Sequence, residues 1–471
     1  MTETNATVLE DISTPPSRLE RVLGVFASVR AREGVTSLLL LSNIFLILMA
    51  YYFIKPVREG WLSVSVISDW SKLEIKSYSA FGQSMLLLVI LPVYAWLAAI
   101  LPRRKLITLT AGVCAILLVL FWLLQPGLLT QQARFAGIAF YMFVGIFGVT
   151  LVAQFWSFAS DLYGQEKGRR LFPLVAIGAS AGGVFGSWIG ERAVELQWLN
   201  AFDLILLALI PLGLAVALAR FIDQRGTLDH SSGEAEIRRV QPAAPEGQGA
   251  FKTIYESQYL TIAAGMILLF NWVVSSGDNI LFGLVQQALE IELAAGDPQA
   301  VARAMNIATT AFYSELYFWV NLMGLLLQAF VVSRLVRLGG FGLLLIATPL
   351  VSLAAYLSMA IAPVIGIIKV MKVAENSSNY SINNTARHML WLPTTKSMMY
   401  QAKATIDTLF VRIGDGLAAL TVLLGTRLWS FSLTDFLFVN IVLSLLWIVL
   451  SACLIREYNQ RSRTMAQAQA A

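Results

Sequence analysis

The feature that most constrains this chain is a succession of long apolar segments, each about the length that crosses a lipid bilayer. The chain has 471 residues, of which 57% are hydrophobic and 13% charged, and a water-soluble domain carries roughly twice that share of charge. The segments expected to span the membrane as helices are 35–57, 77–101, 106–124, 133–162, 171–193, 199–221, 257–289, 306–335, 341–361, 363–391, 400–427 and 433–455. The sequence therefore predicts an all-α membrane protein with about 12 transmembrane helices.

One long polar stretch predicts how the chain is divided. Residues 222–256 have the composition of a flexible linker and separate two groups of six apolar segments, 35–221 and 257–456. A 6+6 arrangement with a central cytoplasmic linker is typical of major-facilitator transporters. We expect residues 1–34 to form a cytoplasmic segment whose end is either an interfacial or a solvated helix, and residues 457–471 to form a cytoplasmic tail.

The distribution of basic residues predicts the orientation. When both termini are placed in the cytoplasm, most of the 34 Lys and Arg residues fall in cytoplasmic loops and tails, as the positive-inside rule requires. The polar, acidic N-terminus shows no cleavable signal peptide. We therefore expect a multi-pass protein of the cytoplasmic (inner) membrane with both termini cytoplasmic.

The tenth predicted segment carries polar and charged residues along one face. At about 100° per residue, six side chains fall within roughly 80° of each other. They are Lys369, Lys372, Asn376, Asn379, Asn383 and Arg387. Ionisable residues inside a bilayer are energetically expensive and usually mark a substrate path. We interpret the three basic residues as unpaired and expect them to attract an anionic substrate.

Two further groups of charges lie in predicted spans. At the end of the first span, Lys55, Arg58 and Glu59 lie within about one helical turn, either at the mouth of a cavity or as an interfacial anchor. In the eleventh span, helical spacing brings two basic residues close to two acidic residues. These pairs either stabilise the helix as static ion pairs or contact the substrate. These pairs are Lys403 with Asp407 and Arg412 with Asp415.

Three other features admit two readings each. Asp161, before the basic end of the fourth span, is either part of a gating latch or of a loop ion pair. Asp278 in the seventh span either couples transport to an ion or makes a structural hydrogen bond between helices. The glycine-rich sequence GASAGGVFGSWIG in the fifth span predicts close helix packing, because no strand precedes it as a phosphate-binding loop requires.

Catalytic chemistry finds little support in the sequence. His230 and His388 assemble no metal or nucleophile cluster, and there is no Walker loop. Cys114 and Cys453 lie in apolar runs and are expected to be buried thiols. We expect a transporter rather than an enzyme, with no cofactor, no metal and no nucleic-acid partner, whose partners are the lipid bilayer and a small anionic substrate.

Four segments resemble the ATP/ADP translocase-type nucleotide transporters of plastids and intracellular bacteria. They are YYFIKPVREGWL, FWSFASDLYGQEKGRRLFP, SSNYSINNTARHMLWLP and KATIDTLFVRIGDG. The resemblance implies a major-facilitator-like carrier of nucleotides. The chain departs from the family pattern at Arg58, Asn383, His388 and Asp415, and Asp278 lacks the Lys that the family places near its acid. These departures leave open whether the substrate is a nucleotide or another phosphorylated or anionic solute.

We therefore expect a secondary transporter that works by alternating access, with ATP/ADP-type exchange as one form of that activity. The substrate-binding residues are expected to be Lys55, Arg58, Lys369, Lys372, Asn376, Asn379, Asn383, Arg387, Lys403 and Arg412. The gating or coupling residues are expected to be Glu59, Asp161, Asp278, Asp407 and Asp415. Two alternatives stay open: a major-facilitator exporter of an unrelated metabolite or drug, and a non-transporting membrane receptor or assembly factor.

Overall fold

Helices make up almost all of the described chain. The computed structural model describes residues 18–23, 29–30, 33–67, 69–128, 135–229, 250–293, 297–395, 398, 402–403 and 405–470, and within these it contains no β-strand. In chain order the helices are α2 (Arg18–Leu23), α3 (Gly34–Val64), α4 (Lys72–Ile100), α5 (Arg103–Leu123), α6 (Ala136–Glu195), α7 (Asp203–Leu207), α8 (Leu209–Asp229), α9 (Ala250–Glu256), α10 (Gln258–Glu292), α11 (Pro298–Leu326), α12 (Val332–Ile361), α13 (Ile365–Ser378), α14 (Asn384–Met389), α16 (Val411–Arg427) and α17 (Leu433–Ala470). Three π-helical turns continue them: η2 (Leu327–Val331), η3 (Asn379–Asn383) and η4 (Ile406–Phe410).

The predicted membrane spans agree well with these helices. Within the described residues, ten helical stretches are long and apolar enough to cross a membrane. The longest of them, Pro298–Ile361, contains two of the predicted spans and is broken at Gly340, where φ is +58° and ψ is −146°. The predicted tenth span, now α13 with η3 and α14, is not among the ten because its polar face lowers its hydropathy. These two differences explain why ten spans are found where about 12 were predicted.

Two segments that were predicted as a loop and a linker are at least partly helical in the structure. The helix α6 runs through the basic sequence between its two apolar parts, Ala136–Tyr163 and Arg170–Glu195, where we expected a loop. The helix α8 continues into the predicted linker as far as Asp229, and α9 occupies its last residues. The middle of that linker, 230–249, lies outside the described residues, as do most of the residues before α3.

The chain forms two compact units that do not follow the sequence halves. The first comprises residues 1–58, 89–136 and 143–238; the second comprises 59–88, 137–142 and 239–471. The end of α3 and the first part of α4 thus pack with the C-terminal half. The two six-helix bundles predicted on either side of the linker, 35–221 and 257–456, stay a prediction.

In the first unit, the glycine-rich part of α6 packs against the backbone of α3. A Cβ atom on Gly178 would lie 2.3 Å from the carbonyl oxygen of Leu41, and one on Gly182 would lie 2.2 Å from that of Phe45. Both approaches are shorter than any normal contact, so only glycine fits at these positions. The expectation that these glycines serve helix packing is confirmed.

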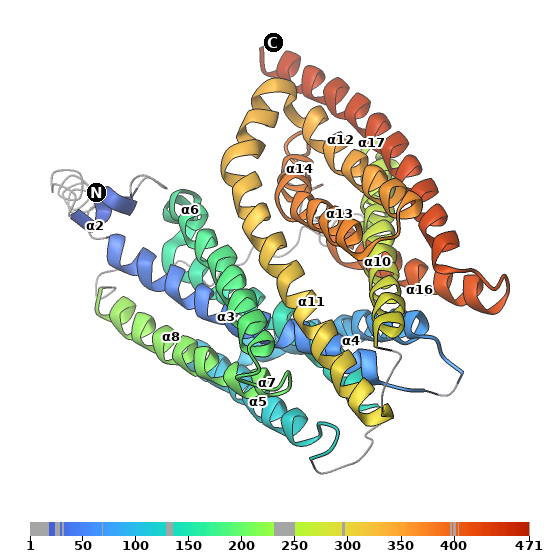
Figure 1. Cartoon of the computed structure of the whole chain (residues 1–471). Helices are drawn as coiled ribbons and strands as arrows, with labels where there is room; N and C mark the ends of the chain where they lie inside the picture. The colour runs from blue at the N-terminus through green and yellow to red at the C-terminus, as the bar shows by residue number, and fades with distance from the viewer. Residues whose placement is uncertain are drawn as a thin grey trace. The chain divides into compact units, whose positions relative to one another are not determined.

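In the second unit, α10, α12, α13, α16 and α17 pack together (Figure 1). The helix α10 contacts α16 and α17, and α12 contacts α13 and α17. The polar helix α13 is therefore covered by neighbours on several sides. This arrangement explains how a segment with so many polar side chains can lie among membrane helices.

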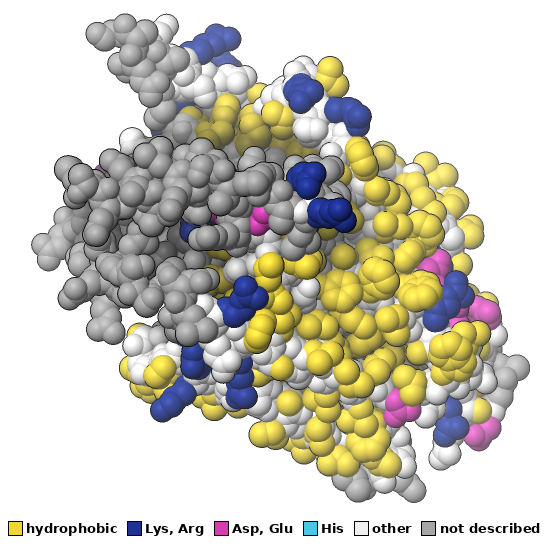
Figure 2. All heavy atoms as spheres, turned by 90° about the vertical axis from the view of Figure 1, so that its left-hand side faces the viewer, with side chains coloured by type: hydrophobic (Ala, Val, Ile, Leu, Met, Phe, Trp, Pro, Cys, Tyr) yellow, Lys and Arg dark blue, Asp and Glu magenta, His cyan; other side chains and the backbone are white. Residues whose placement is uncertain are grey.

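The outer surface suits a lipid environment. Figure 2 shows a wide area of hydrophobic side chains on one face, with charged side chains mainly towards its margins. Large apolar residues such as Ile210, Leu214 and Trp188 are exposed. Apolar surface of this extent suits hydrocarbon, and the predicted all-α membrane protein is confirmed.

Candidate functional site

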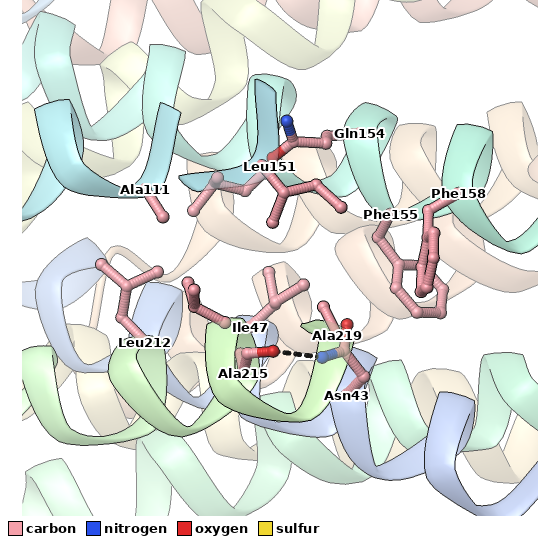
Figure 3. A pocket seen from close by; sticks show the side chains of 12 residues that line it. Asn43, Ile47, Ala111, Leu151, Gln154, Phe155, Phe158, Leu212, Ala215 and Ala219 are labelled. Atoms are coloured by element: carbon pink, nitrogen blue, oxygen red, sulfur yellow. Dashed lines mark hydrogen bonds between the residues drawn. The ribbon is translucent and has the colours of Figure 1, made fainter. Parts of the chain in front are cut away.

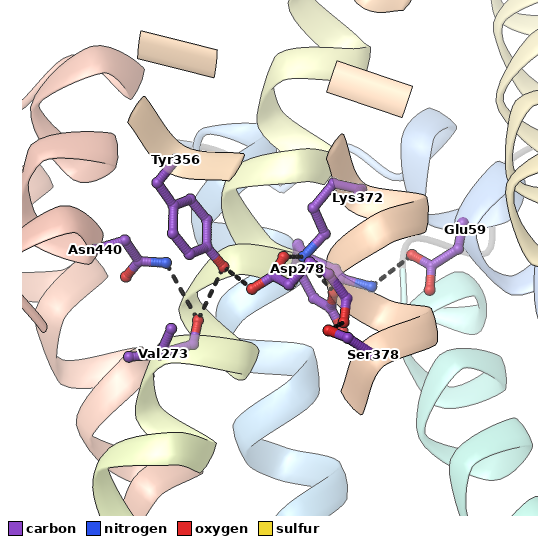
Figure 4. A network of polar contacts seen from close by, with 9 residues as sticks. Glu59, Val273, Asp278, Tyr356, Lys372, Ser378 and Asn440 are labelled. Atoms are coloured by element: carbon purple, nitrogen blue, oxygen red, sulfur yellow. Dashed lines mark hydrogen bonds and ion pairs between the residues drawn. The ribbon is translucent and has the colours of Figure 1, made fainter. Parts of the chain in front are cut away.

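The most buried charged group of the second unit lies on α13, at Lys372. Its ammonium is 2.6 Å from the carboxylate of Glu375 and 3.2 Å from that of Asp278 on α10 (Figure 4). The hydroxyl of Tyr356 on α12 donates to Glu375 at 2.5 Å. The Lys372 and Glu375 side chains are 0% exposed, whereas that of Asp278 is 49% exposed. The cluster is therefore closed on one side and open to its surroundings through Asp278.

This cluster corrects one sequence-based expectation. Lys372 is not an unpaired cation, because two carboxylates hold it. The Lys that the family pattern places near the seventh-span acid is still absent from the sequence, but Lys372 from another helix lies beside Asp278. Glu375 was missed, although its position one turn after Lys372 is itself a pairing signal.

The other two basic residues of the polar face are paired as well. Lys369 donates to Glu315 on α11, and its ammonium lies 5.2 Å from the centre of the Phe312 ring. Arg387 donates to Asp407 at 2.9 Å. The expectation of three unpaired cations was wrong, because carboxylates on neighbouring elements face each of them.

Asp407 stands between two basic side chains. Its second oxygen lies 3.0 Å from the ammonium of Lys403, one turn earlier in the chain, so the predicted local pair is confirmed. Arg387 and Lys403 are 28% and 38% exposed, and both lie beside aromatic rings, of Phe270 and Trp391 respectively. Two cations that share one carboxylate and remain partly accessible suit an anionic group.

A second shared carboxylate lies on α16. Asp415 pairs with Arg412 at 3.0 Å, as the spacing predicted, and accepts a hydrogen bond of 2.6 Å from Ser275 on α10. Ser84 on α4 donates to Asp415 and accepts from Arg412. This contact joins a helix of the N-terminal half to two helices of the C-terminal half.

Two more ion pairs involve the part of α4 that belongs to the second unit. Glu59 accepts from Lys76 at 2.6 Å, and both side chains are buried. Glu74 accepts from Arg427 at the end of α16 at 2.8 Å. Lys76, Glu74 and Arg427 were all missed, because their partners are distant in sequence or on another helix.

Lys55, one turn before Glu59, and Arg58, directly before it, lie in the first unit. The Lys55 ammonium lies 5.5 Å and 5.0 Å from the ring centres of Tyr51 and Tyr52. Both basic side chains are buried. Glu59 bonds Lys76 on α4, so the helical spacing of Lys55 and Glu59 does not by itself account for the contacts of Glu59.

The amide side chains of the polar face are buried. Asn376, Asn379 and Asn383 are all at most 7% exposed. Both polar atoms of the Asn379 side chain lack a hydrogen-bond partner in the described structure. Asn379 also begins η3, and π-helical turns inside α-helices occur often at functional sites. An unsatisfied buried amide at such a turn is suited to bind a polar group that enters from outside.

The first unit contains one pocket lined mainly by apolar side chains and one lined by Arg104, Lys105 and Arg220. Asp161 is 57% exposed and lies 3.8 Å from Arg103, which also bonds Asp223. The pocket in Figure 3 is lined mainly by apolar side chains, with Asn43 donating to the carbonyl of Ala215 and Gln154 donating to Thr110. No charged side chain lines it, so this pocket does not fit a phosphate group.

The described residues contain no group of three or more His, Cys, Asp or Glu side chains able to hold a metal ion. The charged clusters are instead pairs or triads of opposite sign.

Comparisons with known proteins agree with a transporter. The family model described as TLC ATP/ADP transporter matches residues 126–458. No curated protein matches the chain. Among solved structures, the chain is similar to a bacterial homolog of the human lysosomal transporter Spinster, with 15% identity over 92% of this chain and 97% of that chain and a TM-score of 0.53.

Two other solved structures are similar over comparable lengths. The nucleoside transporter NupG, in a mutant form, shows 12% identity over 89% of this chain and 99% of that chain, with a TM-score of 0.55. A D-xylose-proton symporter shows 14% identity over 89% and 97% of the two chains, with a TM-score of 0.58. At these identities the likeness shows the fold alone, and the predicted major-facilitator-like fold is confirmed.

Proposed function

Because the chain is a secondary transporter that belongs to the TLC ATP/ADP transporter family, we propose that it moves a nucleotide or a similar phosphorylated solute by alternating access. We favour ATP/ADP exchange as the form of this activity. The family is shown for this chain, and its substrate is what we propose.

The observation that carries the proposal is the pair of basic side chains around Asp407. Arg387 and Lys403 are both partly exposed and both contact this one carboxylate. A phosphate group can replace Asp407 as their partner, and an Arg guanidinium binds two phosphate oxygens at once. Asp407 would then hold the two cations in place while the site is empty.

The other expected binding residues are proposed to have different roles at this site. Asn379 offers an unsatisfied amide for a base or a ribose hydroxyl, and we assign Asn376 and Asn383 to the same face. Lys369, Arg412, Lys55 and Arg58 are proposed as further cations along the path. Lys372 is retained as a functional residue but in another role, because it is fully buried between carboxylates.

Alternating access requires contacts that form in one state and break in another. We propose that the links from α4 to α10 and α16 are such contacts. They are Glu74 with Arg427, Ser77 with Asn279, and Ser84 with Asp415. Glu59, held by Lys76, belongs to the same region. Asp161, beside Arg103 in the first unit, is proposed as a gating residue of the opposite end.

We place the protein in the cytoplasmic membrane with both termini and the linker on the cytoplasmic side. The excess of basic residues in the corresponding loops supports this orientation. In this orientation, the links between α4 and α16 lie towards the outer face.

Uptake into proteoliposomes tests the proposal. Purified protein is reconstituted into vesicles that contain ADP, and labelled ATP is added outside. We expect uptake that depends on internal ADP and that falls in the Arg387→Gln variant. Arg463→Gln, in the C-terminal tail, serves as the control and should keep the uptake of the unchanged protein.

The same assay separates the alternatives. Flux of other solutes without competition by any nucleotide would favour an exporter of an unrelated metabolite or drug. Nucleotide binding to the purified protein without flux would favour a receptor or assembly factor. Either outcome would overturn the proposed exchange.

A further inference from the structure

The cluster of Lys372, Glu375, Asp278 and Tyr356 does not have the form of a substrate site. Both Lys372 and Glu375 have 0% of their side chains exposed, and the Tyr356 hydroxyl closes the far side of Glu375. A Cβ atom on Gly277 would lie 1.9 Å from that hydroxyl, so the backbone of α10 is in direct contact with the cluster. The Lys372 ammonium is therefore not accessible to a phosphate group in this structure.

The cluster has one more acid than base. Its charged members are two carboxylates, Asp278 and Glu375, and one ammonium, Lys372. With every group ionised, it carries one net negative charge, and burying such a charge among membrane helices is expensive. One added proton makes the cluster neutral, so the groups form a coupled set that takes up a single proton.

Among the described residues, Lys372 is the base that pairs with Asp278 and Glu375. Three packed helices supply the members of the cluster: Asp278 from α10, Tyr356 from α12, and Lys372 with Glu375 from α13. From α17, Asn440 donates to the carbonyl of Val273, which Tyr356 also contacts (Figure 4). Of the other basic side chains near these helices, Lys76 bonds Glu59 and Lys369 bonds Glu315.

We propose that Asp278, Lys372 and Glu375 form a proton-binding site that couples transport to a proton gradient. A proton from water enters at Asp278, the half-exposed member, and forms an O–H bond there. Lys372 then gives a proton to Glu375 and receives the one held by Asp278. The site changes from one negative charge to none, and no other reactant takes part.

The position of Glu375 explains how this proton acts on transport. Glu375 lies on α13, which continues without interruption into η3 at Asn379. Ser378 bonds the carbonyl of Glu375, so the turn that ends α13 is tied to this residue. Because the proposed substrate face includes Asn376 on α13 and Asn379 in η3, protonation and substrate binding act on the same helix. The coupling rests on the transport function proposed above, whereas the proton site does not.

The proton site is tested without any substrate. Infrared difference spectra between acid and alkaline pH record the C=O band of protonated carboxyl groups in the reconstituted protein. We expect one component of this C=O band to be present in the unchanged protein, absent in Glu375→Gln and restored in Glu375→Asp. Glu315→Gln removes another Lys-paired carboxylate from a helix that contacts α13 and should keep the component. Identical spectra for the unchanged protein and Glu375→Gln would overturn the site.

The coupling is tested with ATP in proteoliposomes whose membrane potential is clamped at zero. With ADP inside and one proton moving with each ATP exchanged, a gradient of about one pH unit should raise the internal ATP/ADP ratio about tenfold relative to the ratio outside. Glu375→Gln leaves a neutral Asp278–Lys372 pair, so it should fold, should lose this rise in the ratio and should keep exchange of ATP between equal pools. Glu256→Gln, which removes an exposed Lys-paired carboxylate on α9, should keep both.

The two proposals fail in different ways. Exchange of ATP by the unchanged protein with no response to the pH gradient would overturn the coupling and leave the proposed function intact. Failure of the unchanged protein to move any nucleotide would overturn the proposed substrate, and the infrared result would still decide the proton site.

Discussion

The carboxylate of Glu59 on α3 accepts a hydrogen bond of 2.6 Å from Lys76 on α4, although Lys55 lies one turn earlier on its own helix. Both partners are almost fully buried, and the Lys76 ammonium also lies 4.4 Å from the centre of the Tyr141 ring. The pair therefore fixes two neighbouring membrane helices to each other.

Removal of one partner of this pair should destabilise the protein strongly. A buried charge left without its partner costs about 3–5 kcal/mol, so Glu59→Gln or Lys76→Met alone should lower the thermal unfolding temperature. The double variant Glu59→Gln with Lys76→Met removes both charges of the pair together and should recover most of the loss. Additive losses in the double variant would show that the two side chains do not act as a pair.

Arg387 and Lys403 should both contribute to substrate affinity. Loss of one hydrogen-bonded charge contact costs about 1.5–3 kcal/mol, which weakens binding roughly 10- to 150-fold. We expect this loss in Arg387→Gln and in Lys403→Gln, measured as nucleotide binding to folded protein. The swap Lys403→Asp with Asp407→Lys should stay inactive, because the positive charge is needed at one position. Recovery of transport in the swap would remove Lys403 from the binding site.

The close packing of α6 on α3 predicts a contrast between two glycines of the first unit. Gly182→Ala would place a methyl group 2.2 Å from the Phe45 carbonyl, and overpacking of this kind costs about 1–3 kcal/mol. Gly213→Ala, on α8, would meet nothing within 4 Å. The thermal unfolding temperature should therefore fall in Gly182→Ala and stay close to that of the unchanged protein in Gly213→Ala. Equal unfolding temperatures would contradict the packing described here.

The Glu33–Arg170 pair predicts a pH dependence at the start of α3. Burial by itself would raise the pKa of Glu33, but the bonds from Arg170 and the Arg30 backbone, with the charge of Lys167, outweigh it, so the pKa is lowered. A lowered folded-state pKa stabilises the protein above the ordinary pKa of a Glu carboxyl, near 4.5. This stabilisation should be lost as the pH falls through the folded-state pKa. Glu33→Gln should show a smaller loss of thermal stability on acidification than the unchanged protein.

Reporter fusions test the orientation. A fusion at Gly233, in the predicted linker, and one at Ala471 should both report the cytoplasm. A fusion at Trp70, in the connection between α3 and α4, should report the opposite side. A cytoplasmic signal at all three positions would refute the arrangement of the first two spans.

Sequence reasoning succeeded where the interaction is local. The apolar segments predicted the helices because length and hydropathy decide whether a segment spans a membrane. Lys403 with Asp407 and Arg412 with Asp415 were predictable because helical spacing alone brings them together.

It failed where the partner comes from another helix. Spacing does not reveal which helices are neighbours, so Arg427 could not be matched with Glu74, 353 residues away. The same reason explains why Lys372 and Lys369 were taken as unpaired, although Asp278 and Glu315 face them. Glu375 alone among the missed groups had a local signal, since it follows Lys372 by three residues.

The packing of α4 with the C-terminal helices has a consequence for how the chain can be divided. A C-terminal half produced on its own would retain Arg427 and Asp415 but would lack Glu74 and Ser84, which bond them. The N-terminal half would likewise keep Glu74 without its guanidinium partner. Separately synthesised halves should therefore be poorly stable alone and should stabilise each other when produced together.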